Sequence, residues 1–262
     1  MQLIDTHTHL YDTVFDTDRS DVFNQDINAG VEAFIMPNIN LDSINPMLEL
    51  GREYPEKCFP SIGLHPTDVK QDYKSVLSIM EKQISEHTFI AIGEAGLDLF
   101  WDKTYAEEQE TALEIQIDWA LSMHLPIILH CRKAFDNLYK IIKQRQNGNL
   151  TGVFHCFPGD ETQAQKVTDL GFMLGIGGVV TYKNAAMAKA AASGPLEYIV
   201  LETDAPYLPP APHRGQRNQS AYLVEIANKI AELKEIKPEE VAHITTKNAK
   251  RLFPLINKDN KK

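Results

Sequence analysis

The chain has 262 residues, of which 43% are hydrophobic, and its formal net charge is −10. A core of this size suits one large domain or two small ones, and no apolar run reaches the roughly 18 residues of a membrane span. The acidic charge disfavours proteins that coat nucleic acid, whose affinity comes from neutralising phosphates, but it allows a small local site where divalent metals supply positive charge.

Eight short apolar runs recur along the chain, separated by stretches with the pattern of helices. The runs are mostly continuous rather than alternating, which is typical of strands buried on both faces of a parallel sheet. In chain order they span residues 2–5, 32–37, 59–64, 89–93, 126–130, 151–155, 172–177 and 198–202.

The intervening helical patterns are clearest at 73–87, 105–124, 134–146 and 160–171. This alternation predicts a TIM (β/α)8 barrel, formed as one domain over residues 1–262 with its last few residues, within "NKDNKK", disordered. The alternative is a doubly wound open sheet. No G-x-G-x-x-G follows the first run, so the dinucleotide-binding version of that fold is disfavoured.

The cysteines indicate the compartment. Cys58, Cys131 and Cys156 are odd in number and widely spaced, so they do not form the pattern of a disulfide framework. A reducing compartment fits them, and no secretory leader precedes the first apolar run. We therefore expect a cytoplasmic protein with no membrane partner and no obligate protein partner.

Polar side chains with metal-binding chemistry follow or end several of these runs. In a barrel those positions meet at the carboxyl-terminal rim, where the active site is built. His7 and His9 point the same way because side chains alternate along a strand, so both imidazoles can reach one ion. The candidate ligands are His7, His9, Glu94, His130, His155 and Asp204, and His65 lies at the same rim.

A single histidine at a strand end is more often a hydrogen-bonded rim residue than a ligand. Six such residues on one rim are much harder to explain by chance, and they suffice for two metals that share a carboxylate. Histidine with carboxylates suits Zn²⁺, Mn²⁺, Fe²⁺, Co²⁺ or Ni²⁺. We interpret Cys131 and Cys156 as packing residues, because alternation turns them away from the site. His87, His124 and His243 are assigned to helices, and His213 stays ambiguous.

Seven motifs resemble those of the TatD-type metal-dependent hydrolases, within the amidohydrolase superfamily. They keep the same order over nearly the whole chain. They are "DTHTHL" (5–10), "GLHP" (63–66), "IGEAGLD" (92–98), "LHCRKA" (129–134), "FHCFPG" (154–159), "LETDAPYL" (201–208) and "RGQRNQSAYL" (214–223).

The resemblance implies a two-metal barrel that hydrolyses phosphodiesters, described for the family as deoxyribonuclease activity. By matching positions, His7, His9 and Asp204 would hold one metal and His130 and His155 the second, with Glu94 as the bridge. His65 would lie near the substrate phosphate, and Mg²⁺ would also support activity. Many members carry a histidine where Thr67 stands, and the run "GLDLFWD" replaces a more tyrosine-rich one. These departures bear on substrate preference and leave the ligands intact.

Roles in catalysis follow from this set. Asp204 would accept a proton from the attacking water. Arg132, His65 and Arg214 would hold phosphate oxygens, although Arg132 is as well suited to a salt bridge at the rim. Asp98 and Glu202 would orient ligand histidines or brace a loop. Phe100, Trp101 and Tyr207 would stack on an unpaired base, or pack within their loops.

Three functions compete. The first is hydrolysis of DNA or oligonucleotides at a few terminal nucleotides. The second is hydrolysis of an amide, lactone or ester, including deacylation, since the same metals serve both reactions. In such relatives a carboxylated lysine often bridges the metals, whereas no lysine ends any of the eight runs. The third, a binding protein on a barrel that has lost its activity, is disfavoured by the complete ligand set.

Overall fold

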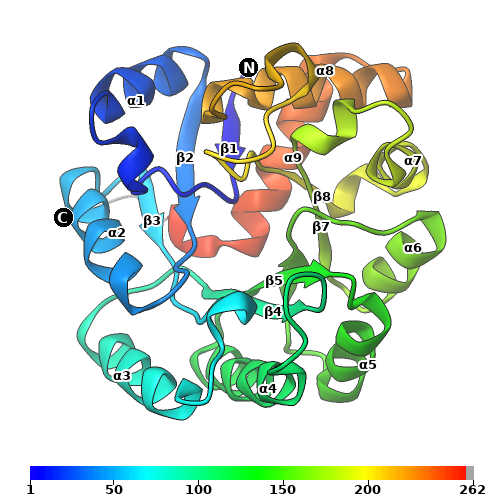
Figure 1. Ribbon diagram of the computed structural model, residues 1–262. Coiled ribbons are helices and arrows are strands. Elements are labelled where there is room, and N and C mark those ends of the chain that lie inside the picture. The colour runs from blue at the N-terminus through cyan, green and yellow to red at the C-terminus, as the bar shows by residue number, and fades with distance from the viewer. Residues whose placement is uncertain (258–262) are drawn as a thin grey trace.

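In the computed structural model, which describes residues 1–257, eight parallel strands alternate with helices along the chain (Figure 1). The strands are β1 (Leu3–Asp5), β2 (Val31–Met36), β3 (Cys58–Pro60), β4 (Ile92–Asp98), β5 (Ile127–Arg132), β6 (Gly152–Phe154), β7 (Met173–Ile176) and β8 (Ile199–Leu201). Strands β1 to β3 form one continuous sheet and β4 to β8 another.

Backbone contacts close the two sheets into one barrel. A parallel bridge between Ile62 and Ile92 joins the segment after β3 to β4. On the other side, the Thr6 N–H donates to the Leu201 carbonyl at 3.0 Å, and a second bridge pairs Thr8 with Ala205. Strand order therefore follows chain order around a closed barrel. The predicted barrel is confirmed, and the open-sheet alternative is wrong.

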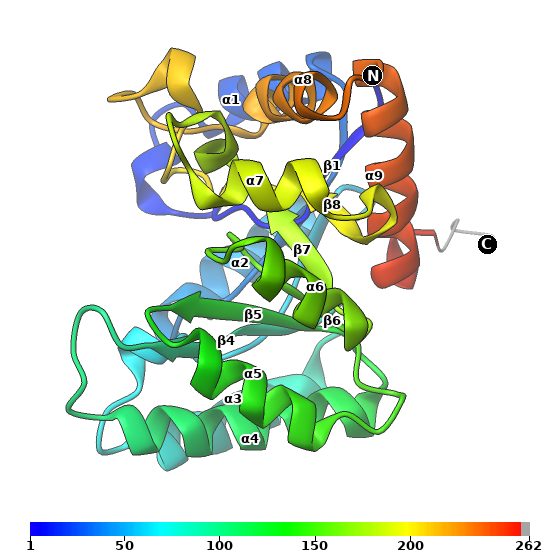
Figure 2. The same ribbon diagram turned by 90° about the vertical axis from the view of Figure 1, so that its right-hand side faces the viewer.

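The helices surround this barrel (Figures 1 and 2). They are α1 (Arg19–Asn28), α2 (Leu41–Glu53), α3 (Tyr73–Glu86), α4 (Ala106–Met123), α5 (Phe135–Arg145), α6 (Glu161–Asp169), α7 (Ala186–Ser193), α8 (Leu223–Lys234) and α9 (Pro238–Leu252). Within residues 1–257, no helix combines the length and apolarity needed to cross a membrane. The tail predicted to be disordered begins at Asn257, and residues 258–262 lie outside the described part of the chain.

Two apolar layers hold the architecture together. The larger one packs the helices against the outer faces of the strands. The smaller one fills the barrel with strand side chains such as Ile35, Ile128 and Val200, and includes Leu252 and Phe253 at the end of α9. Figure 2 shows α9 across the end of the barrel opposite the tips of the strand arrows. That end is plugged, so the carboxyl ends of the strands are left to carry chemistry.

The fourth strand differs most from its prediction. The sequence indicated a strand at 89–93 with Glu94 following it, whereas β4 runs from Ile92 to Asp98 and contains Glu94. Ala95 and Leu97 pack into the outer layer, so Glu94, Gly96 and Asp98 face the barrel interior. Gly96 is required there, because its φ is +150° and a Cβ would overlap the His130 carbonyl of β5.

Candidate metal centre

The segment after β1 places both histidines of the H-x-H pair under the rim, fully or almost fully buried. The carboxylate of Asp5, the last residue of β1, holds this segment in place by hydrogen bonds. One oxygen, Oδ1, accepts the His7 N–H at 3.2 Å and the Thr203 N–H at 3.0 Å. The other, Oδ2, accepts the hydroxyls of Thr203 and Ser220, each at 2.6 Å. Asp5 therefore locks the start of the chain to the loop that carries Asp204.

Glu94 lies between two groups of imidazoles. Its Oε2 is 3.2 Å from His7 Nε2 and 4.0 Å from His9 Nε2. Its Oε1 is 2.8 Å from His130 Nδ1 and 3.6 Å from His155 Nε2. One carboxylate oxygen thus faces each group, which is the arrangement that a bridging ligand needs.

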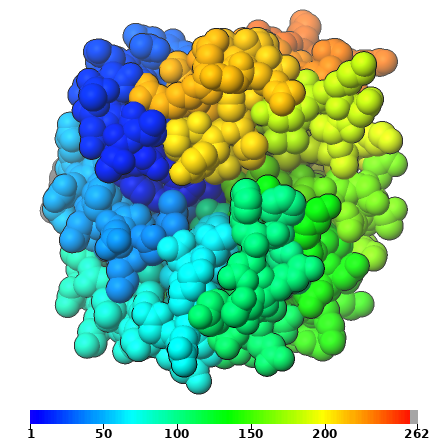
Figure 3. Space-filling view, in the orientation of Figure 1, coloured from blue at the N-terminus to red at the C-terminus, as the bar shows by residue number. Residues whose placement is uncertain are grey.

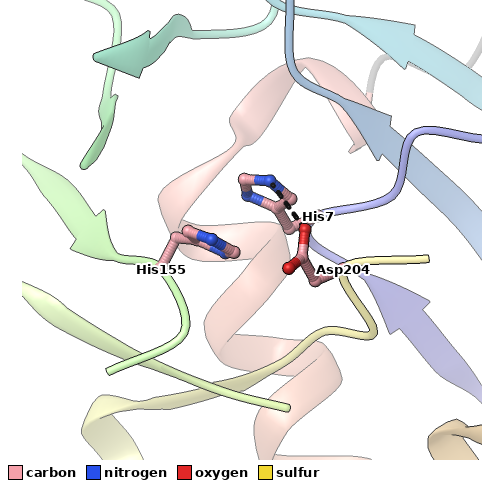
Figure 4. Close-up of side chains that lie close together, drawn as sticks. All are labelled: His7, His155 and Asp204. Atoms are coloured by element: carbon pink, nitrogen blue, oxygen red, sulfur yellow. Dashed lines mark ion pairs between the residues drawn. The ribbon is translucent and has the colours of Figure 1, made fainter. Parts of the chain in front are cut away.

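Asp204 completes the first group. It follows β8 with a left-handed backbone, at φ +59°, and its N–H donates to the His7 carbonyl at 2.8 Å. Its Oδ1 is 3.7 Å from His7 Nε2 and 3.5 Å from His9 Nε2. Figure 4 shows His7, His155 and Asp204 converging from three different segments. The rings of His7 and His155 stack with centroids 3.6 Å apart.

The donor atoms form three overlapping groups, each with its atoms within 4.8 Å of one another. The groups are His7, His9 and Glu94; His7, His155 and Asp204; and His65, Glu94 and His130. All six predicted ligands therefore converge. His65, which the resemblance placed near the substrate, also reaches the cluster.

His65 differs from the other histidines in how it is held. Its Nδ1 lies 2.7 Å from Thr67 Oγ1 and also accepts the Thr67 N–H, at 3.2 Å. These contacts leave Nε2 directed at the cluster, 3.4 Å from Glu94 Oε1. Thr67, at a position where many family members carry histidine, thus orients His65.

A second layer of polar groups orients the cluster. Glu202 Oε1 is 3.0 Å from His155 Nδ1 and also accepts the Cys156 N–H. Glu202 fits because residue 175 on β7 is glycine, where a Cβ would overlap Oε2 of this carboxylate. On β4, Asp98 Oδ2 is 3.1 Å from His130 Nε2. Each predicted orienting carboxylate therefore contacts one histidine of the cluster and also braces a loop.

Tyr11 orients His9, and Tyr11 was not among the site residues predicted from the sequence. Its hydroxyl lies 2.9 Å from His9 Nδ1 and donates to the Pro37 carbonyl at 2.5 Å. A tyrosine two residues after the H-x-H pair would share its side of an extended segment, and this spacing was the available signal. Asp5, also missed, is the residue two before His7.

The pKa values of the cluster residues indicate that the cluster stabilises positive charge. Burial alone would raise the pKa of Glu94, but the charges of nearby histidines lower it well below its ordinary value. Burial likewise opposes a charge on His155, yet Glu202 and Glu94 raise its pKa to about 10. The pKa of His7 is lowered by burial and by the charge of His155.

The negative charges that stabilise a proton on His155, those of Glu202 and Glu94, would also stabilise a divalent cation in the cluster. Both ring nitrogens of His7 are buried; among residues 1–257 Nδ1 has no hydrogen-bond partner, and Nε2 is not in hydrogen-bonding geometry with Glu94 Oε2, which lies 3.2 Å away. Buried polar atoms are rarely left in that state, so a metal ion fits this donor set.

The remaining predicted contacts are resolved as follows. Arg132 has no ion pair within 4.0 Å in the described chain, so the predicted rim salt bridge is wrong; its guanidinium lies over Phe100 and Trp101. Arg214 lies over the Tyr182 ring at 4.6 Å. Tyr207 is 49% exposed near His9.

The other histidines and the cysteines take structural positions. His213 stacks on Tyr222 at 3.7 Å, and His124 caps the end of α4. Cys131 is buried, which raises the pKa of its thiol to about 12, whereas Cys156 is only partly buried. All three cysteines are free.

The face in Figure 3 is hollowed at its centre, where the start of the chain (blue), its middle (cyan and green) and the segment near residue 200 (yellow) meet. A model of the family described as "TatD related DNase" matches residues 4–254. The chain belongs to the TatD-related DNase family. It is therefore a metal-dependent hydrolase, as the motifs predicted.

Its relatives span almost the whole chain. It is 37% identical over 252 residues to YabD of Bacillus subtilis, called an uncharacterized metal-dependent hydrolase, covering 96% of this chain and 98% of that one. It is 30% identical to the Salmonella typhimurium protein named 3'-5' ssDNA/RNA exonuclease TatD, covering 97% and 100%. The crystal structure of the Escherichia coli TatD homolog YjjV superposes with a TM-score of 0.90 at 30% identity, covering 96% and 98%.

Proposed function

We propose that this TatD-family enzyme hydrolyses phosphodiester bonds of DNA or oligonucleotides with two divalent ions. The position of Glu94 carries the proposal, since its Oε2 faces His7 and His9 while its Oε1 faces His130 and His155. Two ions that share one carboxylate can serve both ends of an in-line displacement at phosphorus. A relative at 30% identity is named as a single-strand exonuclease.

The proposal assigns the donor set to two sites. In the proposal His7, His9 and Asp204 hold one ion, His130 and His155 hold the other, and Glu94 bridges them. Zn²⁺, Mn²⁺, Fe²⁺, Co²⁺ and Ni²⁺ match this mixture of imidazole and carboxylate, and Mg²⁺ stays a candidate. Bound divalent ions would acidify a water molecule and neutralise charge on the phosphate.

The side chains contribute proton transfer and phosphate binding. Hydrogen bonding to His9 and the charges of His155 and His7 outweigh burial and lower the pKa of Asp204, so it is ionised at neutral pH. Its carboxylate would accept the proton of the attacking water. His65 and Arg132 would hold the non-bridging phosphate oxygens, since His65 directs Nε2 into the cluster and Arg132 is exposed at the rim.

The predicted cytoplasmic location is part of this proposal. The three free cysteines support a reducing compartment, where thiols persist. The predicted DNA or oligonucleotide partner would bind only at the small site around the cluster.

The test is elemental analysis of the purified protein followed by assays on oligonucleotides labelled at the 3′ or the 5′ end. Parallel reactions use RNA, duplex DNA and a panel of amides, lactones and esters. We expect two metals per chain and shortening of the labelled strands. Turnover confined to the amides, lactones or esters would replace this proposal with the carbonyl-hydrolase alternative.

A further inference from the structure

Two aromatic side chains stand in solvent beside the metal centre. Phe100 is 48% exposed and Trp101 is 68% exposed, both in the loop that follows β4. Their rings meet edge to face, with centroids 5.0 Å apart at 81°. Tryptophan is usually well buried, so an exposed aromatic pair at the rim of an active site indicates a binding surface.

The Arg132 guanidinium completes this surface. It comes from the end of β5, and its central carbon is 4.1 Å from the Phe100 ring centroid and 4.9 Å from that of Trp101. Arginine over an aromatic face is a favourable contact. Because no carboxylate of residues 1–257 lies within ion-pair distance of Arg132, its charge is available to a ligand. We call Phe100, Trp101 and Arg132 the aromatic platform.

Asp98 connects the platform to the metal centre. Its Oδ2 is 3.1 Å from His130 Nε2. Its Oδ1 accepts the N–H of Phe100 at 2.9 Å and that of Trp101 at 3.3 Å. One carboxylate thus contacts a proposed ligand with one oxygen and the backbone of both aromatic residues with the other. The backbone that carries both rings is thereby anchored to the cluster.

A cavity of about 270 Å³ lies against the platform. Trp101, Asp98, Thr67, Lys70 and Tyr105 are among the residues that line it. The cavity therefore adjoins both the exposed tryptophan and the residue that orients His65. This size suits a fragment of a ligand rather than a whole polymer.

We propose that the platform binds one unpaired nucleobase by stacking, next to the phosphate that is cleaved, while Arg132 contacts a non-bridging oxygen of that phosphate. This inference rests on the proposed function and adds the residues that select the substrate. A base inside a duplex hides both faces, and a paired terminal base keeps one face stacked on its neighbour and its edge on its partner, so the platform favours unpaired ends over paired ones. Aromatic stacking tolerates any base, because every base has a π-face.

The first test combines a protein change with a substrate change. Trp101→Ala should raise KM on a single-stranded DNA oligonucleotide about 5- to 150-fold, the usual effect of removing one stacking contact. Trp101→Phe should restore most of the loss. On the same oligonucleotide with an abasic terminal nucleotide, Trp101→Ala and the unchanged protein should have equal KM values.

Controls separate this effect from general damage. Ile79→Ala removes another exposed apolar side chain, 45% exposed on α3 and not part of the cavity lining, and should leave both KM values unchanged. Equal losses for Trp101→Ala on the intact and abasic substrates would overturn the platform. Failure of the unchanged protein to cleave any oligonucleotide would instead overturn the proposed function, and this inference with it.

A second test needs no turnover. The chain has two tryptophans, and Trp119 on α4 is only 8% exposed. In Trp119→Phe, fluorescence reports on Trp101 alone. A single-stranded oligonucleotide with phosphorothioate linkages at its end, which resist cleavage, should quench that fluorescence when added to the metal-loaded protein, and the same oligonucleotide with an abasic end should quench it much less. Equal quenching by both would overturn the stacking proposal.

Discussion

Asp26 is a buried carboxylate that should set how the stability of this barrel depends on pH. It lies on α1 with no exposed surface. Its Oδ1 accepts the Ala221 N–H at 2.6 Å, while Oδ2 has no hydrogen-bond partner among the described residues. Burial raises its pKa from 3.8 to about 8; the Ala221 hydrogen bond opposes this shift and the charge of Asp5 adds to it.

The direction in which stability changes with pH follows from where Asp26 binds its proton. Between these two pKa values the folded chain keeps a proton on Asp26 that the unfolded chain has lost. Its contribution to stability is therefore full below the unfolded pKa and decreases as the pH rises toward the folded one. Each pH unit in this window costs about 1.4 kcal/mol, so moving from about pH 5 to pH 8 should cost about 4 kcal/mol at this one group.

Asp26→Asn tests this reasoning by urea denaturation at several pH values. Asparagine keeps an acceptor for Ala221, and its amide places a donor without a partner near Oδ2, a cost of about 1–3 kcal/mol that does not vary with pH. The measured quantity is therefore the slope of unfolding free energy against pH. The variant should lose about 4 kcal/mol less than the unchanged protein over this range.

Titrating groups that do not interact with Asp26 contribute equally to both proteins and cancel in the comparison. Asp21→Asn, an exposed carboxylate on the same helix, controls for the loss of one negative charge. Parallel curves for Asp26→Asn and the unchanged protein would refute the reasoning, because they would mean that Asp26 releases its proton at the same pH in both states.

Three further predictions concern the site. Glu94→Ala should abolish turnover while circular dichroism stays native, because it removes the oxygens that face both imidazole groups; a near-native rate would exclude Glu94 from the mechanism. Glu202→Gln should weaken metal binding about 10- to 100-fold by equilibrium dialysis, since it removes the charge beside His155 Nδ1; unchanged affinity would leave Glu202 only as a brace for the Cys156 N–H. Strong chelation should stop turnover and an added divalent ion should restore it, whereas activity that persists without metal would contradict the assignment.

The sequence located the side chains that converge in the cluster because their chemistry and their spacing coincide; their role as metal ligands stays a prediction. Strand ends alternate with helices, and imidazoles at those ends are conspicuous against apolar runs. Strand β4 shows the limit of this approach. Its inward face is made of Glu94, Gly96 and Asp98, so apolar periodicity missed most of it and detected the preceding "FIAIG" instead. When polar or glycine residues replace the apolar residues on the interior face of a strand, the apolar pattern that predicts a strand is lost.

Contacts between residues far apart in the chain could not be predicted from the sequence. Asp5 binds Ser220 across 215 residues and Thr203 across 198, and no local pattern marks those partners. Arg132 shows the same limit at the surface. Both alternatives considered for it were polar, whereas the structure places its guanidinium over two aromatic rings.

The overall charge of −10 is compatible with a phosphodiester substrate only if the charge at the mouth of the barrel is less negative than that of the whole protein. Four carboxylates surround the cluster: Glu94 and Asp204 within it, and Asp98 and Glu202 around it. Alone they would repel a phosphate. Two divalent ions carry as much charge as these four groups, so the loaded site would be close to neutral, with Arg132 beside it. Beyond that mouth an acidic body would repel a long polyanion, and the proposed stacking on Trp101 would be a source of affinity that depends little on salt. The two proposals together therefore favour a substrate held by its last few unpaired nucleotides over one bound along its length.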